Sequence, residues 1–199
     1  MKDFNLYLIT DSKRDVIQDV KIAIENGVKI IQLRDKVNKK ETILETAKQL
    51  RELTKESNTI LIINDHIDIA KEVNADGVHL GQDDTPIKEA RTILNNKIIG
   101  ISCHSLDQAI KAEKDGADYI GIGPIFKTQT KNYQEIGSNI ITNVKNSIKI
   151  PFITIGGIDK DNIDEVLNAG TTRVAIISAL LNENYINNLN YFKNKLGGM

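Results

Sequence analysis

Charged side chains follow several short apolar segments of this sequence, at the point where each segment ends. The members of this set are Arg34, Lys36, Asp65, Asp84 and Lys131. Arginine binds phosphate through two parallel hydrogen bonds, and lysine adds a point charge. Mg²⁺ prefers oxygen ligands and usually binds one or two carboxylates together with substrate phosphates. The set therefore indicates a site for a diphosphate and Mg²⁺, and the alternative is a surface of ordinary ion pairs.

The elements that would position these residues repeat one unit, a short β-branched run followed by a longer stretch with helical spacing. The runs are Leu6–Thr10, Lys29–Leu33, Ile60–Asn64, Gly77–Leu80, Ile98–Ser102, Tyr119–Gly123, Phe152–Ile155 and Val174–Ser178. The helical stretches are Val16–Glu25, Lys40–Lys55, Ile67–Val73, Ile87–Leu94, Leu106–Asp115, Ile140–Asn146, Asp161–Asn168 and Tyr185–Leu196. Strict alternation predicts a parallel α/β sheet, with the runs as strands buried on both faces.

Eight such units favour a closed (β/α)8 TIM barrel that forms a single domain over residues 1–199, with its functional site at the carboxyl ends of the strands. An open doubly wound sheet is the alternative, but no G-x-G-x-x-G follows the first run. Residues typical of helix caps lie at the ends of the predicted helices. Ser105 can cap the helix that starts at Leu106, and Gly27, Gly116 and Gly170 follow the ends of helices.

A second anion site is predicted after the last two strands. Gly156 and Gly157 follow the seventh run, while Ile177 and Ser178 end the eighth. Loops at these places in barrels commonly hold a phosphate with backbone N–H groups, although the glycines could also serve only a tight turn. Two anion sites, one of them for a diphosphate and a metal, point to group transfer with loss of diphosphate.

Composition limits the partners that the chain can have. The formal net charge is −1 and there is one cysteine among 199 residues. This charge gives no global field for nucleic acid or a membrane surface, and a lone cysteine allows no intramolecular disulfide. We expect a cytoplasmic protein that acts on small molecules and binds neither nucleic acid nor membrane. A homo-oligomer is compatible with this composition.

The chain closely resembles the thiamine-phosphate synthase family, in ordered motifs that run from YLITD at Tyr7 to IISAL at Leu180. Between them lie QLRDK, IINDHIDIA, ADGVHLGQDD, GISCHS, ADYIGIGPIF, TQTK and ITIGGI. The resemblance implies a (β/α)8 barrel. It also implies an enzyme, a transferase that joins a hydroxymethylpyrimidine diphosphate to a thiazole phosphate with Mg²⁺, by a dissociative mechanism in which the diphosphate leaves first.

The resemblance also implies roles for individual residues. The pyrimidine diphosphate would be bound by Gln32, Leu33, Arg34, Asp35, Lys36, Asn64, Ser102 and Lys131. Of these, Arg34, Lys36, Ser102 and Lys131 would act in catalysis. The thiazole phosphate would be bound by Thr128, Gln129, Thr130, Gly157, Ile177 and Ser178. Asp65 and Asp84 would hold Mg²⁺.

Two other functions compete with the synthase. A thiazole tautomerase on the same scaffold tends to lose the magnesium acids and the diphosphate cluster, and a binding protein without activity would need no leaving-group machinery. The magnesium acids Asp65 and Asp84 and the diphosphate cluster with Arg34 and Lys131 are all present here, which favours the synthase.

The histidines and the cysteine are expected to serve the structure. Cys103 should point away from its neighbours Ser102 and His104, because adjacent strand residues face opposite ways. His104 is expected to orient a loop and His79 to be a hydrogen-bonded barrel residue.

Overall fold

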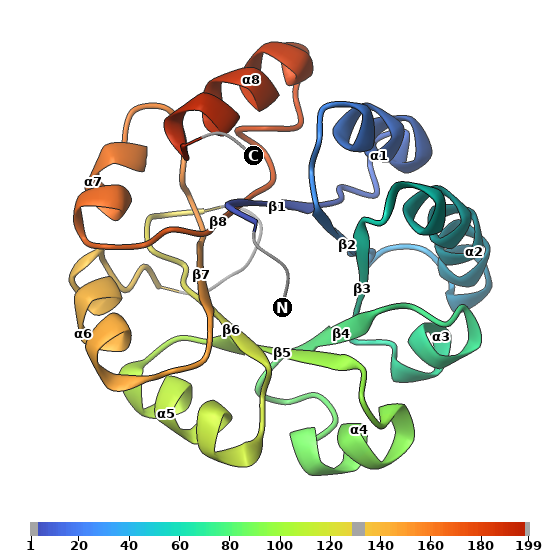
Figure 1. Ribbon diagram of the computed structural model, residues 1–199, viewed down its shortest axis with the longest axis horizontal. Coiled ribbons are helices and arrows are strands. Elements are labelled where there is room, and N and C mark those ends of the chain that lie inside the picture. The colour runs from blue at the N-terminus through green and yellow to red at the C-terminus, as the bar shows by residue number, and fades with distance from the viewer. Residues whose placement is uncertain (1–3, 129–133, 198–199) are drawn as a thin grey trace.

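In the computed structural model, which describes residues 4–128 and 134–197, eight parallel strands pair in chain order and close into a barrel (Figure 1). The strands are β1 (Leu6–Ile9), β2 (Ile30–Leu33), β3 (Ile60–Asn64), β4 (Gly77–Leu80), β5 (Ile98–Cys103), β6 (Tyr119–Ile122), β7 (Phe152–Ile155) and β8 (Val174–Ile176). The barrel closes where Leu8 of β1 pairs with Ile176 of β8. The predicted (β/α)8 fold is confirmed.

Helices surround the barrel, one after each strand (Figure 1). They are α1 (Val16–Glu25), α2 (Lys40–Ser57), α3 (Ile67–Glu72), α4 (Ile87–Leu94), α5 (Leu106–Asp115), α6 (Asn139–Ser147), α7 (Ile163–Asn168) and α8 (Tyr185–Lys195). Predicted and observed bounds differ by at most two residues at either end. Among the helices of the described residues, none has the length and hydropathy to cross a membrane.

The local signals at helix ends are confirmed. The Ser105 side chain accepts a hydrogen bond from the backbone N–H of Gln108 at 3.2 Å, which caps the start of α5. Gly27, Gly116 and Gly170 have φ angles of 81°, 96° and 102°. This left-handed conformation is the one that glycine adopts without steric cost.

Strand side chains alternate between two apolar layers, which explains why the runs are apolar throughout. Along β1, Leu6 and Leu8 belong to the larger layer, which includes the buried faces of the helices, while Tyr7 and Ile9 belong to the smaller cluster inside the barrel. Tyr119 of β6 also lies in this inner cluster. The barrel interior is therefore a packed core with two tyrosines in it.

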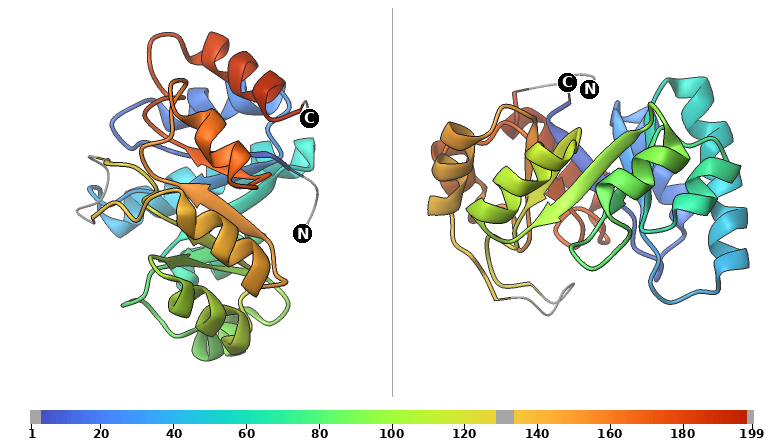
Figure 2. Two further views of the ribbon diagram at one scale, coloured as in Figure 1. Left: turned by 90° about the vertical axis from the view of Figure 1, so that its left-hand side faces the viewer. Right: turned by 90° about the horizontal axis from the view of Figure 1, so that it is seen from below.

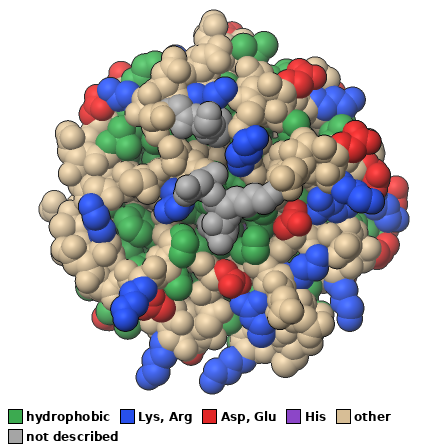
Figure 3. Space-filling model, in the orientation of Figure 1, with side chains coloured by type: hydrophobic (Ala, Val, Ile, Leu, Met, Phe, Trp, Pro, Cys, Tyr) green, Lys and Arg blue, Asp and Glu red, His purple; other side chains and the backbone are tan. Residues whose placement is uncertain are grey.

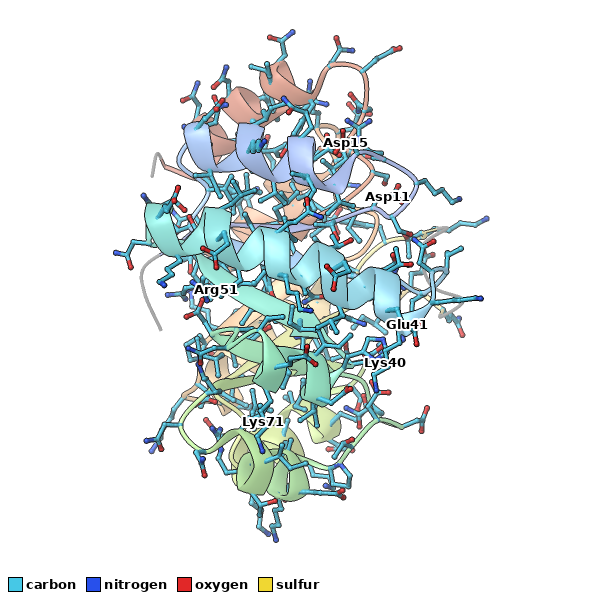
Figure 4. All side chains as sticks on the ribbon, turned by 90° about the vertical axis from the view of Figure 1, so that its right-hand side faces the viewer. Asp11, Asp15, Lys40, Glu41, Arg51 and Lys71 are labelled. Carbon is cyan, nitrogen blue, oxygen red and sulfur yellow. The ribbon has the colours of Figure 1, made fainter. Side chains whose placement is uncertain are left out.

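The two ends of the barrel carry different parts of the chain. Figure 2 shows the start of β1 and the end of α8 at one end of the barrel, and the described parts of the connection between β6 and α6 at the other. In Figure 4, Lys40 at the start of α2 lies toward the same end as Asp11, which follows β1, and Arg51 lies toward the opposite end. Helices thus begin where strands finish, and we call this end the mouth.

Figure 3 shows the end opposite the mouth, where basic and acidic side chains lie interspersed around the rim. Neighbouring charges of opposite sign offset one another at long range. This arrangement agrees with the formal net charge of −1.

Candidate active site

A pocket opens among the loops at the mouth, and all eight strands or the residues just beyond them contribute to its lining. It holds about 870 Å³ of empty space, including the open solvent at its mouth. The side chains of its lining that can form hydrogen bonds are those of Tyr7, Gln32, Arg34, Asn64, His79, Ser102, His104, Tyr119, Thr128 and Ser178. Its apolar wall is aliphatic, with Ile9, Ile153 and Ile155 among its members. A ligand with a flat apolar part and anionic ends would match such a lining.

The structure brings together residues from both predicted anion sites. From the predicted diphosphate site, Gln32, Arg34, Asn64 and Ser102 line the pocket. From the predicted thiazole-phosphate site, Thr128, Gly157, Ile177 and Ser178 line the same pocket. Gln129, Thr130 and Lys131 lie outside the described residues.

Arg34 is the cation of the described lining. Its backbone N–H donates to Thr10 Oγ1 at 3.0 Å, which fixes the chain just beyond β2. Its Nε is buried and has no hydrogen-bond partner among the described residues. A buried donor without an acceptor is costly, so this guanidinium is suited to receive an anion.

Three described residues of the predicted diphosphate site, Leu33, Asp35 and Lys36, do not line the pocket. Leu33 packs in the layer between barrel and helices, because it alternates with Gln32 and Arg34. The Asp35 carboxylate accepts hydrogen bonds from the N–H groups of Val37 and Asn38 at 2.9 and 3.0 Å. Partial burial disfavours the charged form, but these bonds and one from the Asn38 side chain outweigh it and lower the pKa of Asp35. The carboxylate therefore shapes the turn after β2.

The two predicted magnesium ligands approach one another beside the pocket. Burial raises the pKa of Asp65, and the neighbouring carboxyl of Asp84 raises it further, while Lys36 acts in the opposite direction through an ion pair. Asp84 is held by the backbone N–H of Gly81 at 2.6 Å. Two facing carboxylates resist joint ionisation unless a cation lies between them. The oxygen donors and their mutual repulsion fit a hard divalent cation.

The glycine pair after β7 makes a tight turn against the connection after β6. Gly156 and Gly157 have φ angles of 101° and 65°. A Cβ on Gly157 would lie 2.5 Å from the Lys127 carbonyl oxygen, so only glycine fits there. Among the described residues, the backbone N–H groups of Gly157 and Ser178 have no acceptor. The tight turn and the predicted phosphate site are therefore compatible in one loop.

A chain of buried hydrogen bonds, which the sequence patterns did not predict, crosses the floor of the pocket. It joins Gln32, Tyr7, Tyr119, His79 and Ser102, which belong to five different strands. The signal available in the sequence was the position of both tyrosines within apolar strands, where a hydroxyl needs a buried partner. The expectation that His79 is a hydrogen-bonded barrel residue is confirmed.

Cys103 and His104 have structural surroundings. Cys103 is fully buried between barrel and helices, and burial raises the pKa of its thiol to about 12, which keeps it from forming a thiolate. The ring of His104 forms a hydrogen bond through Nδ1 with the Gly123 carbonyl oxygen, and its backbone N–H donates to Gln108. These bonds agree with an orienting role for His104.

Comparison with known proteins gives one consistent result. The family model described as "Thiamine monophosphate synthase" matches residues 6–180. The thiamine-phosphate synthase of Halalkalibacterium halodurans is 49% identical over 188 residues, which cover 91% of this chain and 89% of that protein. The corresponding protein of Shouchella clausii is 46% identical over 188 residues, with coverage of 91% and 90%. The solved structure of thiamine phosphate pyrophosphorylase from Pyrococcus furiosus superimposes with a TM-score of 0.89 at 39% identity, over 98% of this chain and 97% of that one.

Proposed function

Because this chain belongs to the thiamine monophosphate synthase family, we propose that it is a transferase that joins a hydroxymethylpyrimidine diphosphate to a thiazole phosphate. The products are thiamine phosphate and diphosphate. Both substrates are small molecules, and both carry an anionic group.

The observation that best supports this proposal is the single pocket shared by two anion-binding groups. Arg34 Nε and the backbone N–H groups of Gly157 and Ser178, none of which has an acceptor among the described residues, belong to residues of the same lining. A pocket for one monophosphate would need only one of these groups. The aliphatic wall that includes Ile153 and Ile155 suits the two heterocycles.

The chemistry is a dissociative substitution at the pyrimidine methylene carbon. The C–O bond breaks and its electron pair leaves with the diphosphate, which gives a pyrimidine methyl cation. The thiazole nitrogen then donates its lone pair to that carbon and forms the C–N bond. This sequence needs no protein nucleophile, only neutralisation of the leaving charge and close positioning of the two rings.

The protein's part is to bind, orient and neutralise. Arg34 and Lys36 would neutralise the diphosphate, and the hydroxyl of Ser102 would donate to it. Asn64 would orient the diphosphate, and Gln32, with Oε1 and Nε2 on one amide, would orient the pyrimidine. The N–H groups of Gly157 and Ser178 would hold the thiazole phosphate, with Ile177 against the ring.

Residues after Thr128 complete the proposal. Lys131 would add a second cation at the diphosphate, while Gln129 and Thr130 would join Thr128 at the thiazole phosphate. These three lie outside the described residues, so their roles depend on family membership and on the match of TQTK.

Mg²⁺ fits the pair Asp65 and Asp84, whose mutual repulsion a cation would relieve. When bound, the ion would supply positive charge to the departing diphosphate. Lys36, already paired with Asp65, would then lie beside both the carboxylates and the diphosphate.

The test is an assay of the purified protein with both substrates, with and without Mg²⁺. Equal amounts of thiamine phosphate and diphosphate, formed only with Mg²⁺, are expected. Absence of both products from folded protein would refute the proposal. A measurable conversion of thiazole tautomers in the same sample would then identify the tautomerase, and binding of thiazole phosphate without turnover would identify a binding protein.

A further inference from the structure

The hydrogen-bond chain under the pocket is continuous and buried. Gln32 Nε2 donates to Tyr7 Oη at 3.0 Å, and Tyr7 Oη lies 2.9 Å from Tyr119 Oη. Tyr119 Oη lies 2.9 Å from His79 Nδ1, and His79 Nε2 lies 2.9 Å from Ser102 Oγ. None of the five residues has more than 9% of its surface exposed.

The donor at one end fixes the direction of every bond. Tyr7 Oη accepts a hydrogen bond from Gln32 Nε2–H, and its own single proton needs an acceptor. Tyr119 Oη is its other partner among the described residues, so Tyr7 donates to Tyr119. Because Tyr119 Oη accepts from Tyr7, it donates its own hydrogen bond to His79 Nδ1. Burial raises the pKa of both tyrosines well above the ordinary value, so each hydroxyl stays protonated and acts as a hydrogen-bond donor.

The same reasoning sets the state of the far end. Because Nδ1 of His79 accepts, the neutral ring carries its proton on Nε2 and donates it to Ser102 Oγ. The hydroxyl of Ser102 then has its own proton to donate to another acceptor. If every hydrogen bond ran in the opposite direction, the Ser102 hydroxyl would donate its proton to His79 Nε2.

We propose that Tyr7, Tyr119 and His79 are positioning residues that hold His79 as the Nε2–H tautomer and so keep Ser102 as a hydrogen-bond donor toward the pocket. The acceptor of this bond would be an oxygen of the diphosphate, a part of the inference that rests on the proposed function. The three residues line the floor of the pocket, and their proposed effect on the diphosphate passes through Ser102.

The tautomer is measured by nitrogen NMR of isotopically labelled protein, above the ordinary histidine pKa of about 6.5. Substitutions His66→Gln and His104→Gln assign the three rings. The expected result is an Nε2–H ring for His79 and an Nδ1–H ring for His104, which faces the Gly123 carbonyl. An Nδ1–H ring for His79 would overturn the proposal, whatever the enzyme's activity.

The influence on Ser102 is measured with inorganic diphosphate and Mg²⁺, by calorimetry. We expect Tyr119→Phe to weaken diphosphate binding about five-fold, the equivalent of one hydrogen bond of about 1 kcal/mol. Tyr185→Phe is the matched control. It removes another buried tyrosine hydroxyl, which donates to the Asp19 carbonyl at 2.9 Å, and should leave binding unchanged.

A double-mutant cycle separates positioning from a general loss of packing. If Tyr119 acts through Ser102, then Tyr119→Phe should have no further effect on diphosphate binding in a Ser102→Ala background. Additive losses would overturn the positioning role. If wild-type protein does not bind diphosphate, the proposed function fails at this site, while the tautomer result still decides the direction of the chain.

Discussion

At the scale of single residues, the proposed metal site contains two carboxylates that repel one another. Asp65 adopts a φ of 62°, a left-handed conformation that aspartate tolerates better than most residues, and faces Asp84. Burial raises the pKa of Asp65 and Asp84 raises it further; Lys36 offsets only part of these two effects together, because the pKa remains raised. Such local cost is typical of functional sites.

Loss of either charge at the proposed diphosphate site should slow the reaction. We expect Asp65→Asn and Lys131→Ala each to reduce turnover at least ten-fold, which corresponds to about 1.4 kcal/mol of transition-state stabilisation. Steady-state kinetics with both substrates and saturating Mg²⁺ provide the measurement. Lys149→Ala, which removes an exposed lysine from the segment before β7, is the control. Wild-type rates in either variant would show that the diphosphate binds elsewhere.

The raised pKa of Asp65 predicts that Asp65→Asn, which should lower turnover, raises the stability of the folded protein. Its folded-state pKa lies above the ordinary value of 3.8, so its contribution is fully present below that value and is lost as pH rises through the folded-state pKa. At neutral pH, Asp65→Asn should therefore unfold at a higher temperature than wild type without metal. Mg²⁺ should raise the wild-type melting temperature and have little effect on the variant. A lower melting temperature in metal-free Asp65→Asn would contradict this account.

At the scale of elements, two loops at the mouth are locked together. The turn Gly156–Gly157 after β7 packs against the segment after β6, where the N–H of Phe126 donates to the Gly156 carbonyl at 3.0 Å. The Asn162 side chain also donates to the Gly157 carbonyl, at 2.8 Å. Both carbonyl groups of the turn therefore accept hydrogen bonds from neighbouring segments, whereas the N–H of Gly157 has no acceptor within residues 4–128 and 134–197.

Gly157→Ala tests this packing. The added Cβ would lie 2.5 Å from the Lys127 oxygen at a positive φ, so we expect a loss of about 2–3 kcal/mol in the free energy of unfolding and weaker thiazole-phosphate binding. Urea denaturation gives the first and calorimetry the second. Gly116→Ala is the control, since its φ is also positive but no atom lies within 4 Å of the added Cβ. It should cost only about 1 kcal/mol. Equal losses would mean that contact with the β6 segment is unimportant.

At the scale of the whole molecule, closure of the barrel joins the two ends of the chain. β8 pairs with β1, and the C-terminal helix α8 covers them with the fully buried Leu189 and Phe192. The Asn5 side chain donates to the Leu196 carbonyl at 2.8 Å, which links the two ends again. The first and last elements are therefore expected to unfold together with the rest.

Phe192→Ala should lower the free energy of unfolding by about 3–5 kcal/mol, because it removes a large buried side chain. Fluorescence of the tyrosines and far-ultraviolet circular dichroism should report the same urea midpoint. Ile186→Ala on the same helix is the control, because Ile186 is 53% exposed, and should change stability by less than about 0.5 kcal/mol. Separate midpoints for the two probes would show that α8 unfolds independently.

The sequence by itself determined the order of the elements and the polar groups that follow them. Strands such as Gly77–Leu80 and helices such as Leu106–Asp115 were predicted to the residue, because periodicity and caps are local properties of the chain. The family motifs identified Arg34, Ser102 and Gly157, which do line one pocket.

Only the tertiary structure decided which side chains meet. It separated Leu33 and Asp35 from the pocket, since the direction of a side chain depends on the register and the turn in which it lies. It also joined Tyr7 with Tyr119, which are 112 residues apart, into a hydrogen-bond chain. Such a contact has no local signature, because it exists only when a closed barrel brings β1 and β6 to face each other across its interior.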